Sequence, residues 1–391
     1  MSGHAEQMHL IRRDLCRRAV EHARNGTTDM APDVMHNDVS AYTDPDRFAR
    51  EQRKLFREMP QVVCLSTDLA GPGSYRLFDD AGVPIVVIRG KDGLVRAFLN
   101  ICPHRGARLV RGTSDKANRM TCWFHGWTFD STGRAIGVPQ EPLFCGKIDE
   151  QKHLIACPAE ERHGLVFVLP TPGATMDLDA HLGTFGAELD MLDLGEARAV
   201  KDGELRVTCN WKYALDTYFE NYHFATLHRN SIGPFFVNNV SLYDSWGLHH
   251  RLVFPPRDAG QWVSRPESEW LIDTLGTPYF IFPNTIIFNG SLSANAAYVT
   301  TFRLFPVGVG EMVTRMTTYA PHGVNSPEDR AEVEAAFLAM ADLVGKEDYA
   351  VTGEAWRNFA AMPKGSKVVY GRQEIAVQNF HRKLDGVLAA A

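Results

Sequence analysis

Two short segments of the chain place cysteine and histidine at a spacing that suits metal binding. One reads Cys-Pro-His-Arg-Gly from Cys102, and the other reads Cys-Trp-Phe-His-Gly from Cys122. Each segment offers one thiolate and one imidazole, with His104 and His125 as the histidines. Such a set can hold one tetrahedral zinc ion, or a [2Fe–2S] cluster with cysteine on one iron and histidine on the other.

The arrangement of these four donors favours the cluster over zinc. Structural zinc loops usually begin with two cysteines, whereas here each loop contributes one cysteine and one histidine. The residues that flank the donors also closely resemble those of a Rieske protein. This resemblance implies that the cluster is bound by Cys102, His104, Cys122 and His125.

A second pair of candidate ligands, His223 and His228, lies in the second half of the chain. An open non-haem iron site uses two histidines and one carboxylate, which leaves positions for O2 and substrate. The third ligand must come from elsewhere, and the candidates are Asp342, Glu347 and Asp348. The histidine pair alone is a weak signal. It gains weight beside the cluster, because a Rieske centre needs an electron acceptor.

The elements that must position the first four donors are predicted to be strands. Short β-rich runs at 75–78, 84–89 and 95–99 are separated by turns that contain glycine. They predict a small antiparallel β domain with the two cluster loops at its tips. A last strand at 164–169 is followed by a Pro-Thr-Pro-Gly run from Pro170, which predicts a domain boundary.

Beyond this boundary, the chain is predicted to contain both helices and strands. We expect a helix after the Asn-Trp-Lys run that starts at Asn210, followed by further strands and a long helix at 327–346. The first of these helices is expected to carry the candidate site residues Asp216, Glu220, Asn221 and His223, with His228 near its end.

Length and composition narrow the class of protein. A chain of 391 residues favours two domains. The net charge of −6 and the lack of a basic stripe argue against a nucleic-acid partner. The apolar runs are too short to span a bilayer, and the N-terminus has no apolar signal core, so we expect no membrane association. The seven cysteines follow no disulfide pattern, which favours a reducing cytoplasm.

Nearly the whole chain resembles the catalytic α-subunit of Rieske non-haem iron oxygenases, the aromatic ring-hydroxylating dioxygenase family. The resemblance implies an α+β fold in three parts. Residues 1–45 would form a helical segment that packs on the catalytic domain. Residues 46–170 would form a small antiparallel β Rieske domain. Residues 171–391 would form a catalytic domain with a large antiparallel sheet covered by helices, of the helix-grip type.

The resemblance also implies a mononuclear Fe(II) bound by His223, His228 and a late aspartate, for which we choose Asp348 and keep Asp342 in reserve. Many family members have an aspartate three residues before the first iron-binding histidine, which bridges to a cluster ligand of the neighbouring subunit. Here Glu220 takes that position, as in choline- and carnitine-type monooxygenases. Because residues i and i+3 share one helical face, Glu220 is expected to orient His223. The resemblance implies that Glu220 also acts as the electron-transfer bridge. We also expect Asp216 and Asn221 near the iron.

The function implied is that of a terminal oxygenase component, which uses O2 to hydroxylate an aromatic compound at the iron. Its electrons would come from NAD(P)H through a separate reductase or ferredoxin. The alternative is a monooxygenase that acts as an N- or O-demethylase or oxidises a quaternary ammonium compound, which Glu220 favours. The family pattern implies a homotrimer with electron transfer across subunits and leaves open whether a β-subunit is present.

Aromatic residues that could line a substrate pocket are Phe219, Phe224, Phe235, Phe236, Trp246, Phe280, Phe282 and Phe288.

Overall fold

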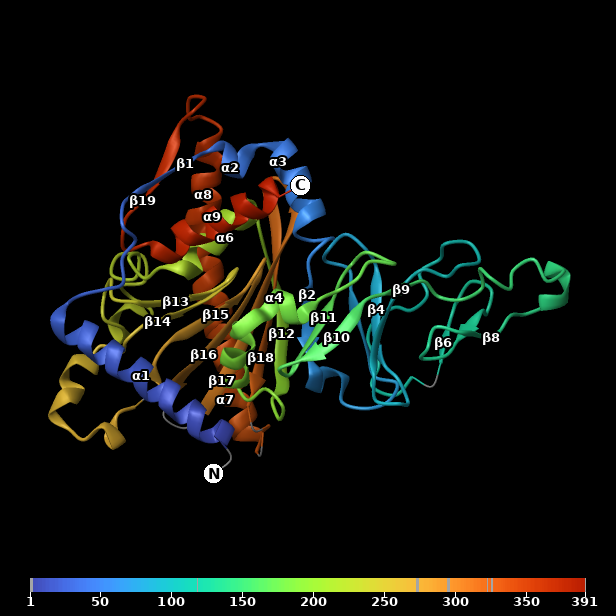
Figure 1. The fold of residues 1–391 in the computed structure, drawn as a ribbon, viewed down its shortest axis with the longest axis horizontal. Coiled ribbons are helices and arrows are strands. Elements are labelled where there is room, and N and C mark those ends of the chain that lie inside the picture. Colours follow the sequence, from blue (N-terminus) through green and yellow to red (C-terminus); the bar gives the residue numbers. More distant parts are fainter. Residues whose placement is uncertain are drawn as a thin grey trace. The chain divides into compact units, whose positions relative to one another are not determined.

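The computed structural model describes residues 3–117, 119–271, 274–293, 296–321, 323–324 and 326–390. The chain forms two compact units, which are described separately (Figure 1). The large unit combines Met1–Arg50, Gly183–Leu192 and Ala197–Ala391, and the small unit combines Glu51–Leu182 and Asp193–Glu196. The domain boundaries at 46 and 170 stay predictions, because a functional domain need not end where a compact unit ends.

The large unit is built on one seven-stranded antiparallel sheet. Neighbouring strands β13 and β14 are joined by a two-residue turn that starts at Gly247, whose φ of +54° lies in the left-handed region that glycine adopts easily. Strand β15 is buried along its full length, in keeping with its apolar sequence. In spatial order, the strands are β12 (Arg198–Val207), β18 (Glu311–Ala320), β17 (Ala296–Gly308), β16 (Thr285–Ser293), β15 (Thr277–Ile281), β14 (His249–Val253) and β13 (Leu242–Trp246).

Helices cover this sheet, as Figure 1 shows. Helix α7 packs against β12, β17 and β18. Its N-terminus is capped by Ser326, whose side chain accepts a hydrogen bond from the N–H of Asp329. Gly203 on β12 leaves room for the ring of Phe337, which a Cβ atom there would meet at 2.9 Å. The helices are α1 (Gly3–Asn25), α2 (Ser40–Thr43), α3 (Pro45–Lys54), which begins in this unit, α5 (Gly186–Asp190), α6 (Trp211–Asp216), α7 (Pro327–Leu343), α8 (Tyr349–Phe359) and α9 (Ile375–Ala389).

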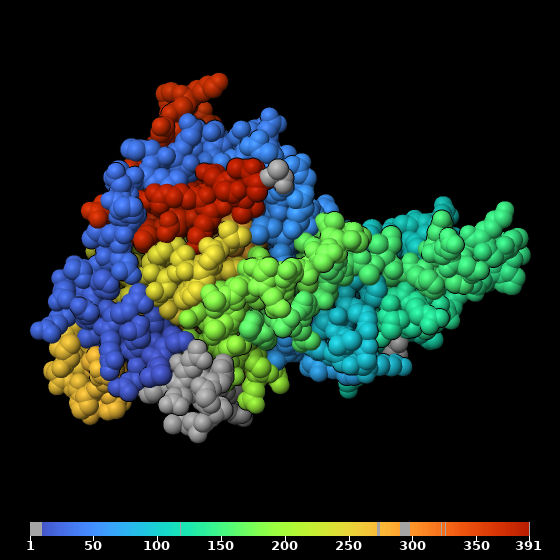
Figure 2. All heavy atoms as spheres, viewed as in Figure 1, coloured from blue at the N-terminus to red at the C-terminus, as the bar shows by residue number. Residues whose placement is uncertain are grey.

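Two peripheral contacts complete the large unit. Strand β1 (Met35–Asp38) pairs with β19 (Lys367–Tyr370), so the early chain is hydrogen-bonded to its late part. Helix α1 packs against the 3₁₀ segment η6 (Ala259–Ser264), and Figure 2 shows α1 in blue beside this segment in orange. The predicted helical segment at the N-terminus therefore lies on the unit that contains the large sheet. None of the described helices is long and apolar enough to cross a membrane.

The described residues of the small unit form three antiparallel sheets, the end of α3 and one short helix, α4 (Leu178–Leu182). Its apolar core continues directly to Cys102 and Cys122. The predicted fold class is confirmed: a small antiparallel β unit accompanies a large antiparallel sheet covered by helices. The three sheets are β3 (Tyr75–Phe78), β4 (Ile85–Arg89), β5 (Val95–Leu99) and β9 (Ala156–Cys157); β10 (Ala159–Arg162), β11 (Leu165–Val168) and β2 (Gln61–Leu65); and β6 (Met120–Thr121), β7 (Thr128–Phe129) and β8 (Ala135–Gly137).

The predicted long helix after Asn210 is wrong. Helix α6 ends at Asp216, a 3₁₀ turn covers Thr217–Phe219, and Glu220 has extended backbone angles of −155° and 165°. His223 and His228 therefore lie in a loop of successive turns and not on a helix. The physical reason is local. The Glu220 carboxylate binds the backbone N–H groups that a continuing helix would use, including that of His223 at 3.1 Å.

Candidate metal centres

The two loops that begin at Cys102 and Cys122 have matching geometry. In each, the cysteine N–H donates to the carbonyl five residues later, at 2.7 and 2.8 Å. The cysteine carbonyl accepts from the glycine four residues later, at 2.9 Å in both loops. These glycines, Gly106 and Gly126, both have a φ of +73°, which other residue types rarely adopt. The Cys-x-His and Cys-x-x-His spacings are thus two versions of one closed turn.

Within these loops, the two predicted histidine donors lie side by side, and the two cysteine side chains are in contact. The rings of His104 and His125 lie 4.5 Å apart, and His104 stacks on Trp127 with ring centroids 4.9 Å apart. Nδ1 of His104 is buried and has no hydrogen-bond partner among the described residues. Burial raises the pKa of the Cys102 thiol to about 11. Buried sulfurs and an unpaired buried imidazole nitrogen fit a cationic group held between the loops.

The loop that carries the second histidine pair is tied down at several points. The Glu220 carboxylate accepts the N–H of His223, and the N–H of Leu227 donates to the His223 carbonyl at 2.8 Å. Gly233 closes the loop, because its N–H donates to the His228 carbonyl at 2.9 Å. A Cβ atom on Gly233 would lie 2.8 Å from that same carbonyl oxygen. Only glycine can approach the loop this closely.

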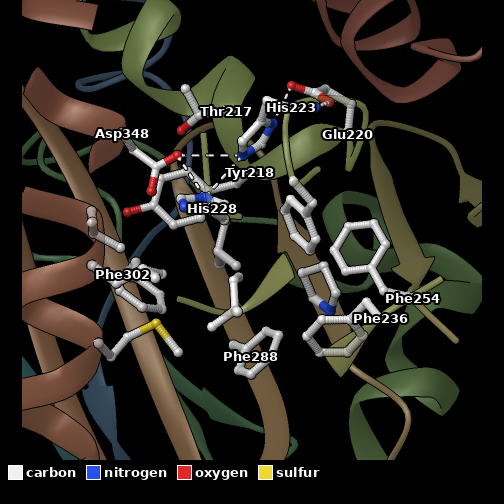
Figure 3. Close-up of a pocket in the computed structure, with 17 residues that line it drawn as sticks. Thr217, Tyr218, Glu220, His223, His228, Phe236, Phe254, Phe288, Phe302 and Asp348 are labelled. Carbon is white, nitrogen blue, oxygen red and sulfur yellow. Dashed lines mark hydrogen bonds and ion pairs between the residues drawn. The ribbon is translucent and has the colours of Figure 1, made fainter. Parts of the chain in front are cut away.

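Three side chains meet beside this loop, and Figure 3 shows them at one end of a cavity. Nε2 of His223 and Nε2 of His228 lie 3.1 Å apart. Oδ1 of Asp348 lies 3.4 Å from each of these nitrogens. Two histidines and one carboxylate this close together match the facial arrangement of non-haem Fe(II) sites, with the remaining positions open to the cavity.

The far side of each imidazole is held by its own carboxylate. Nδ1 of His223 lies 2.5 Å from Glu220, and Nδ1 of His228 lies 2.8 Å from Glu347. A carboxylate at Nδ1 keeps the proton on that nitrogen, so that Nε2 can offer its lone pair to a metal. The donor set therefore fits a divalent iron. The contact between Glu220 and His223 is made through a turn and not through a helical face.

Asp348 and Glu347 reach the site from a π-helical turn, Val344–Asp348, between α7 and α8. Consecutive residues of an α-helix point about 100° apart. Here both carboxylates contact His228, Glu347 at Nδ1 and Asp348 at Nε2. Such an extra residue in a helix is often found at functional sites. The wider turn explains how two neighbouring acidic residues serve the same histidine.

Charge in the site follows from burial and from these contacts. Burial alone would lower the pKa of His223, but hydrogen bonds to Asp348 and Glu220 raise it to about 9. Burial would also lower the pKa of His228, but its hydrogen bond to Asp348 outweighs burial and raises that pKa. The pKa of Asp348 is lowered by the two imidazoles, although burial acts in the opposite direction. A bound cation would replace these protons.

The other predicted site residues are not among the three clustered donors. Asp342 is exposed and pairs with Lys346 at 2.7 Å, so it is not among the clustered donors. Asn221 donates to the backbone carbonyl of Val240 at 2.8 Å and fixes the loop. Asp216 is buried and binds His381, with Nε2–Oδ1 at 3.0 Å. Neither residue is within the group of metal-binding donors.

The cavity beside the three donors is lined mainly by apolar side chains. Of the predicted aromatic residues, Phe224, Phe236 and Phe288 line it. Phe219, Phe280 and Phe282 are buried, Phe235 is 62 % exposed, and neither they nor Trp246 line this cavity. Sequence analysis missed most of the wall, because its residues come from distant strands and helices and share no local motif. The remaining lining residues are Thr217, Tyr218, Ile232, Phe254, Pro278, Ile286, Phe302, Met340, Leu343 and Val344, in addition to the donors and Glu220.

Comparison with known proteins agrees with this geometry. Together, the fold and the two donor sets define the class of Rieske proteins with a second, mononuclear iron site. Residues 59–147 match the Rieske [2Fe-2S] domain, and residues 194–390 match the ring hydroxylating alpha subunit (catalytic domain). The chain belongs to the ring-hydroxylating alpha-subunit family. A Rieske [2Fe–2S] cluster and a mononuclear iron are therefore its cofactors.

Relatives in this family include both monooxygenases and dioxygenases. The chain is 30 % identical to the oxygenase subunit of carnitine monooxygenase from Escherichia coli (strain K12), over 54 % of this chain and 55 % of the relative. It is 30 % identical to the alpha subunit of chlorobenzene dioxygenase from Cupriavidus sp. (strain PS12), over 80 % of this chain and 72 % of the relative. The chain thus spans about half the length of the carnitine enzyme subunit that it matches.

Solved structures share the fold. A quaternary ammonium Rieske monooxygenase superposes with a TM-score of 0.77 at 21 % identity, covering 96 % of this chain and 97 % of the other. Naphthalene 1,2-dioxygenase from Rhodococcus sp. superposes with a TM-score of 0.75 at 18 % identity, covering 97 % and 98 %. Identities this low establish the architecture and do not choose between the two activities.

Proposed function

We propose that this chain is a terminal oxygenase component that uses O2 and externally supplied electrons to hydroxylate an aromatic compound. The observation that carries the proposal is the apolar cavity at the open side of His223, His228 and Asp348 (Figure 3). When bound, the iron supplies O2 activation. The protein supplies the ligands, the orientation of the substrate and the exclusion of water from the cavity.

The proposal assigns the two cofactors to the predicted domains. Residues 46–170 would hold the [2Fe–2S] cluster and residues 171–391 the iron, with residues 1–45 packed on the latter domain. Support comes from the paired rings of His104 and His125 in the small unit and from the three clustered donors in the large one. The cluster ligands in this assignment are Cys102, His104, Cys122 and His125, and the iron ligands are His223, His228 and Asp348.

The wall of the cavity favours a neutral ring. Phe288 and Phe302 lie away from the donors, with Phe236 and Phe254 along one side (Figure 3). No arginine or lysine is found among the described residues that line it. A substrate carboxylate buried here would lack a cationic partner, at a cost of several kcal/mol. The cavity measures about 80 Å³. This is about half the volume of an apolar cavity known to bind benzene, so the wall must yield for even one ring to enter.

One observation favours the second candidate, a monooxygenase that oxidises a methylated amine. Rings such as those of Phe224, Phe236 and Phe254 can hold a quaternary ammonium group by cation–π attraction. Glu220 also matches the choline- and carnitine-type pattern. The same wall offers no partner for the carboxylate of carnitine, so this candidate would use a substrate without that group.

Electron supply and assembly follow the family pattern in this proposal. A reductase or ferredoxin would reduce the cluster, with NAD(P)H as the source, and Glu220 would bridge the cluster of one subunit to the iron of the next in a homotrimer. The contact of Glu220 with His223 supports such a bridge. A β-subunit would be an additional partner. None of the seven cysteines forms a disulfide among the described residues, which supports a cytoplasmic location.

Product analysis under 18O2 tests the function. The reduced, iron-loaded protein is offered single-ring arenes, methoxyarenes, carnitine and methylated amines without a carboxylate. The proposal predicts labelled hydroxyl oxygen on the arene. Formaldehyde release from a methylated amine, with no arene product, would instead establish the second candidate. Turnover of carnitine would contradict the interpretation of the cavity wall.

A further inference from the structure

A second cavity lies against the same site and differs in chemistry from the first. It measures about 240 Å³ and is lined by three carboxylates, Asp216, Glu220 and Glu374, and by the hydroxyl-bearing Tyr213 and Tyr370. A cavity of this size and polarity accommodates ordered water. Val351 and Val369, which are 43 % and 57 % exposed, contribute to its wall, so it reaches the surface.

Three residues line both cavities: Thr217, Glu220 and His223. They form the partition between the apolar chamber and the second one, whose lining mixes aliphatic side chains with carboxylates and hydroxyls. The apolar chamber offers no titratable side chain beyond the site itself and Tyr218, among the described residues. Among the residues that line the two cavities, the carboxylates outside the site lie in the second cavity, which therefore offers protons a route to the site.

The proposed function requires such protons. Dihydroxylation of an arene adds O2, two electrons and two protons to the ring. Monooxygenation also takes up two electrons and two protons, because the second oxygen atom leaves as water. The electrons come from the reductase, and the protons come from solvent. Both reactions thus take up the same number of protons per turnover.

We propose that Glu374 is the proton-relay residue of this enzyme. It releases a proton through cavity water toward Glu220 and His223, where the proton joins oxygen derived from O2, and it recovers a proton from solvent through the exposed wall. The inference rests on the proposed oxygenase function but not on the choice between its two candidates.

The surroundings of Glu374 suit this role. The titratable groups that face it are Asp216 and Tyr213 from α6, Glu220 and His223 from the loop, and Tyr370 from β19. Burial raises the pKa of Glu374 to about 7, with the negative charges of Glu220 and Asp216 adding to the effect and His223 opposing it. A group that is half protonated at neutral pH both gives and regains a proton readily.

Infrared difference spectra of the holoenzyme across pH provide the first test. The band of a protonated carboxylic acid should vanish with a midpoint near pH 7 in the wild type. It should be absent in Glu374→Gln and unchanged in Glu354→Gln, which alters an exposed glutamate on α8. Glu374→Gln keeps an acceptor for the Gly371 N–H, which Glu374 binds at 2.5 Å. A wild type without such a band, or a band that survives in Glu374→Gln, would overturn the assignment.

The pH profile of product formation provides the second test, with whichever substrate the 18O2 panel identifies. The wild-type rate should fall as pH rises through 7, because only the protonated acid donates. Glu374→Gln should be slower by about 10²-fold and lose this dependence. Glu374→Asp, which keeps an acid, should recover part of the rate. A wild-type rate and profile in Glu374→Gln would refute the relay. A panel without any product would contradict the proposed function, while the infrared result would still decide whether Glu374 holds the proton.

Discussion

The four proposed cluster donors come from residues 102–125, whereas the three proposed iron donors come from residues 223, 228 and 348. Each cluster loop is closed by its own backbone hydrogen bonds and one glycine, so its shape is a local property. The iron site needs a loop and a π-helical turn that are distant in sequence and meet only after folding. Damage to a cluster loop should therefore stay local, whereas the iron site should also respond to changes in its supports.

The largest effect is expected from loss of the distant ligand. Asp348→Ala removes the carboxylate that lies 3.4 Å from both imidazole nitrogens. Iron content, measured by metal analysis, should fall to background and turnover should cease, while the cluster absorbance stays. Asp342→Ala is the matched control, since Asp342 is exposed on the preceding helix. Iron loss in the control rather than in Asp348→Ala would reverse the ligand assignment.

A backbone change should have the next largest effect. In Gly233→Ala the added Cβ would lie 2.5 Å from the Phe224 carbonyl oxygen, so the loop must shift. We expect a loss of about 1–3 kcal/mol in unfolding free energy, together with weakened iron binding and an intact cluster spectrum. Gly386→Ala on α9 has open space and should be neutral or slightly stabilising. Denaturant unfolding with metal analysis checks both variants, and normal iron content in Gly233→Ala would count against the role of the loop.

Removal of a supporting carboxylate should have a moderate effect. Glu347→Gln weakens the hydrogen bond to Nδ1 of His228, which measures 2.8 Å, and leaves the proposed iron-binding atom Nε2 in place. Iron affinity should drop by about 10–100-fold, as found for groups that orient metal-binding histidines. Competition with a chelator measures this. Glu332→Gln, on the exposed part of α7, serves as control. An unchanged affinity would mean that the loop alone orients His228.

The smallest change for a single step is expected from a shift of one pH unit. Because the pKa of His223 is raised to about 9 in the iron-free protein, this imidazole is protonated at pH 7 and must lose its proton when iron binds. Iron affinity should therefore rise by about tenfold for each pH unit from 6 towards 9. Chelator competition at several pH values gives the slope. A flat profile would show that no proton is displaced at this site.

The sequence could predict what depends on neighbouring residues. Both cluster loops, the β runs around them and the His223–His228 pair are local patterns with known chemistry. The long helix predicted after Asn210 failed, because the competing Glu220 turn has no distinctive motif. Glu347 and Asp348 were both candidates, and spacing alone could not rank them, because the π-helical turn that orients both of them is invisible in the sequence.

By itself, then, the sequence determined the Cys-x-His and Cys-x-x-His loops, the α+β class and the presence of two histidines suited to iron. The tertiary structure decided that Asp348 and not Asp342 joins those histidines, and that Glu347 supports one of them. It also decided which side chains wall the apolar cavity and which wall the polar one. The reason is physical: short-range geometry is encoded in adjacent residues, whereas a cavity wall is set by long-range packing of strands and helices.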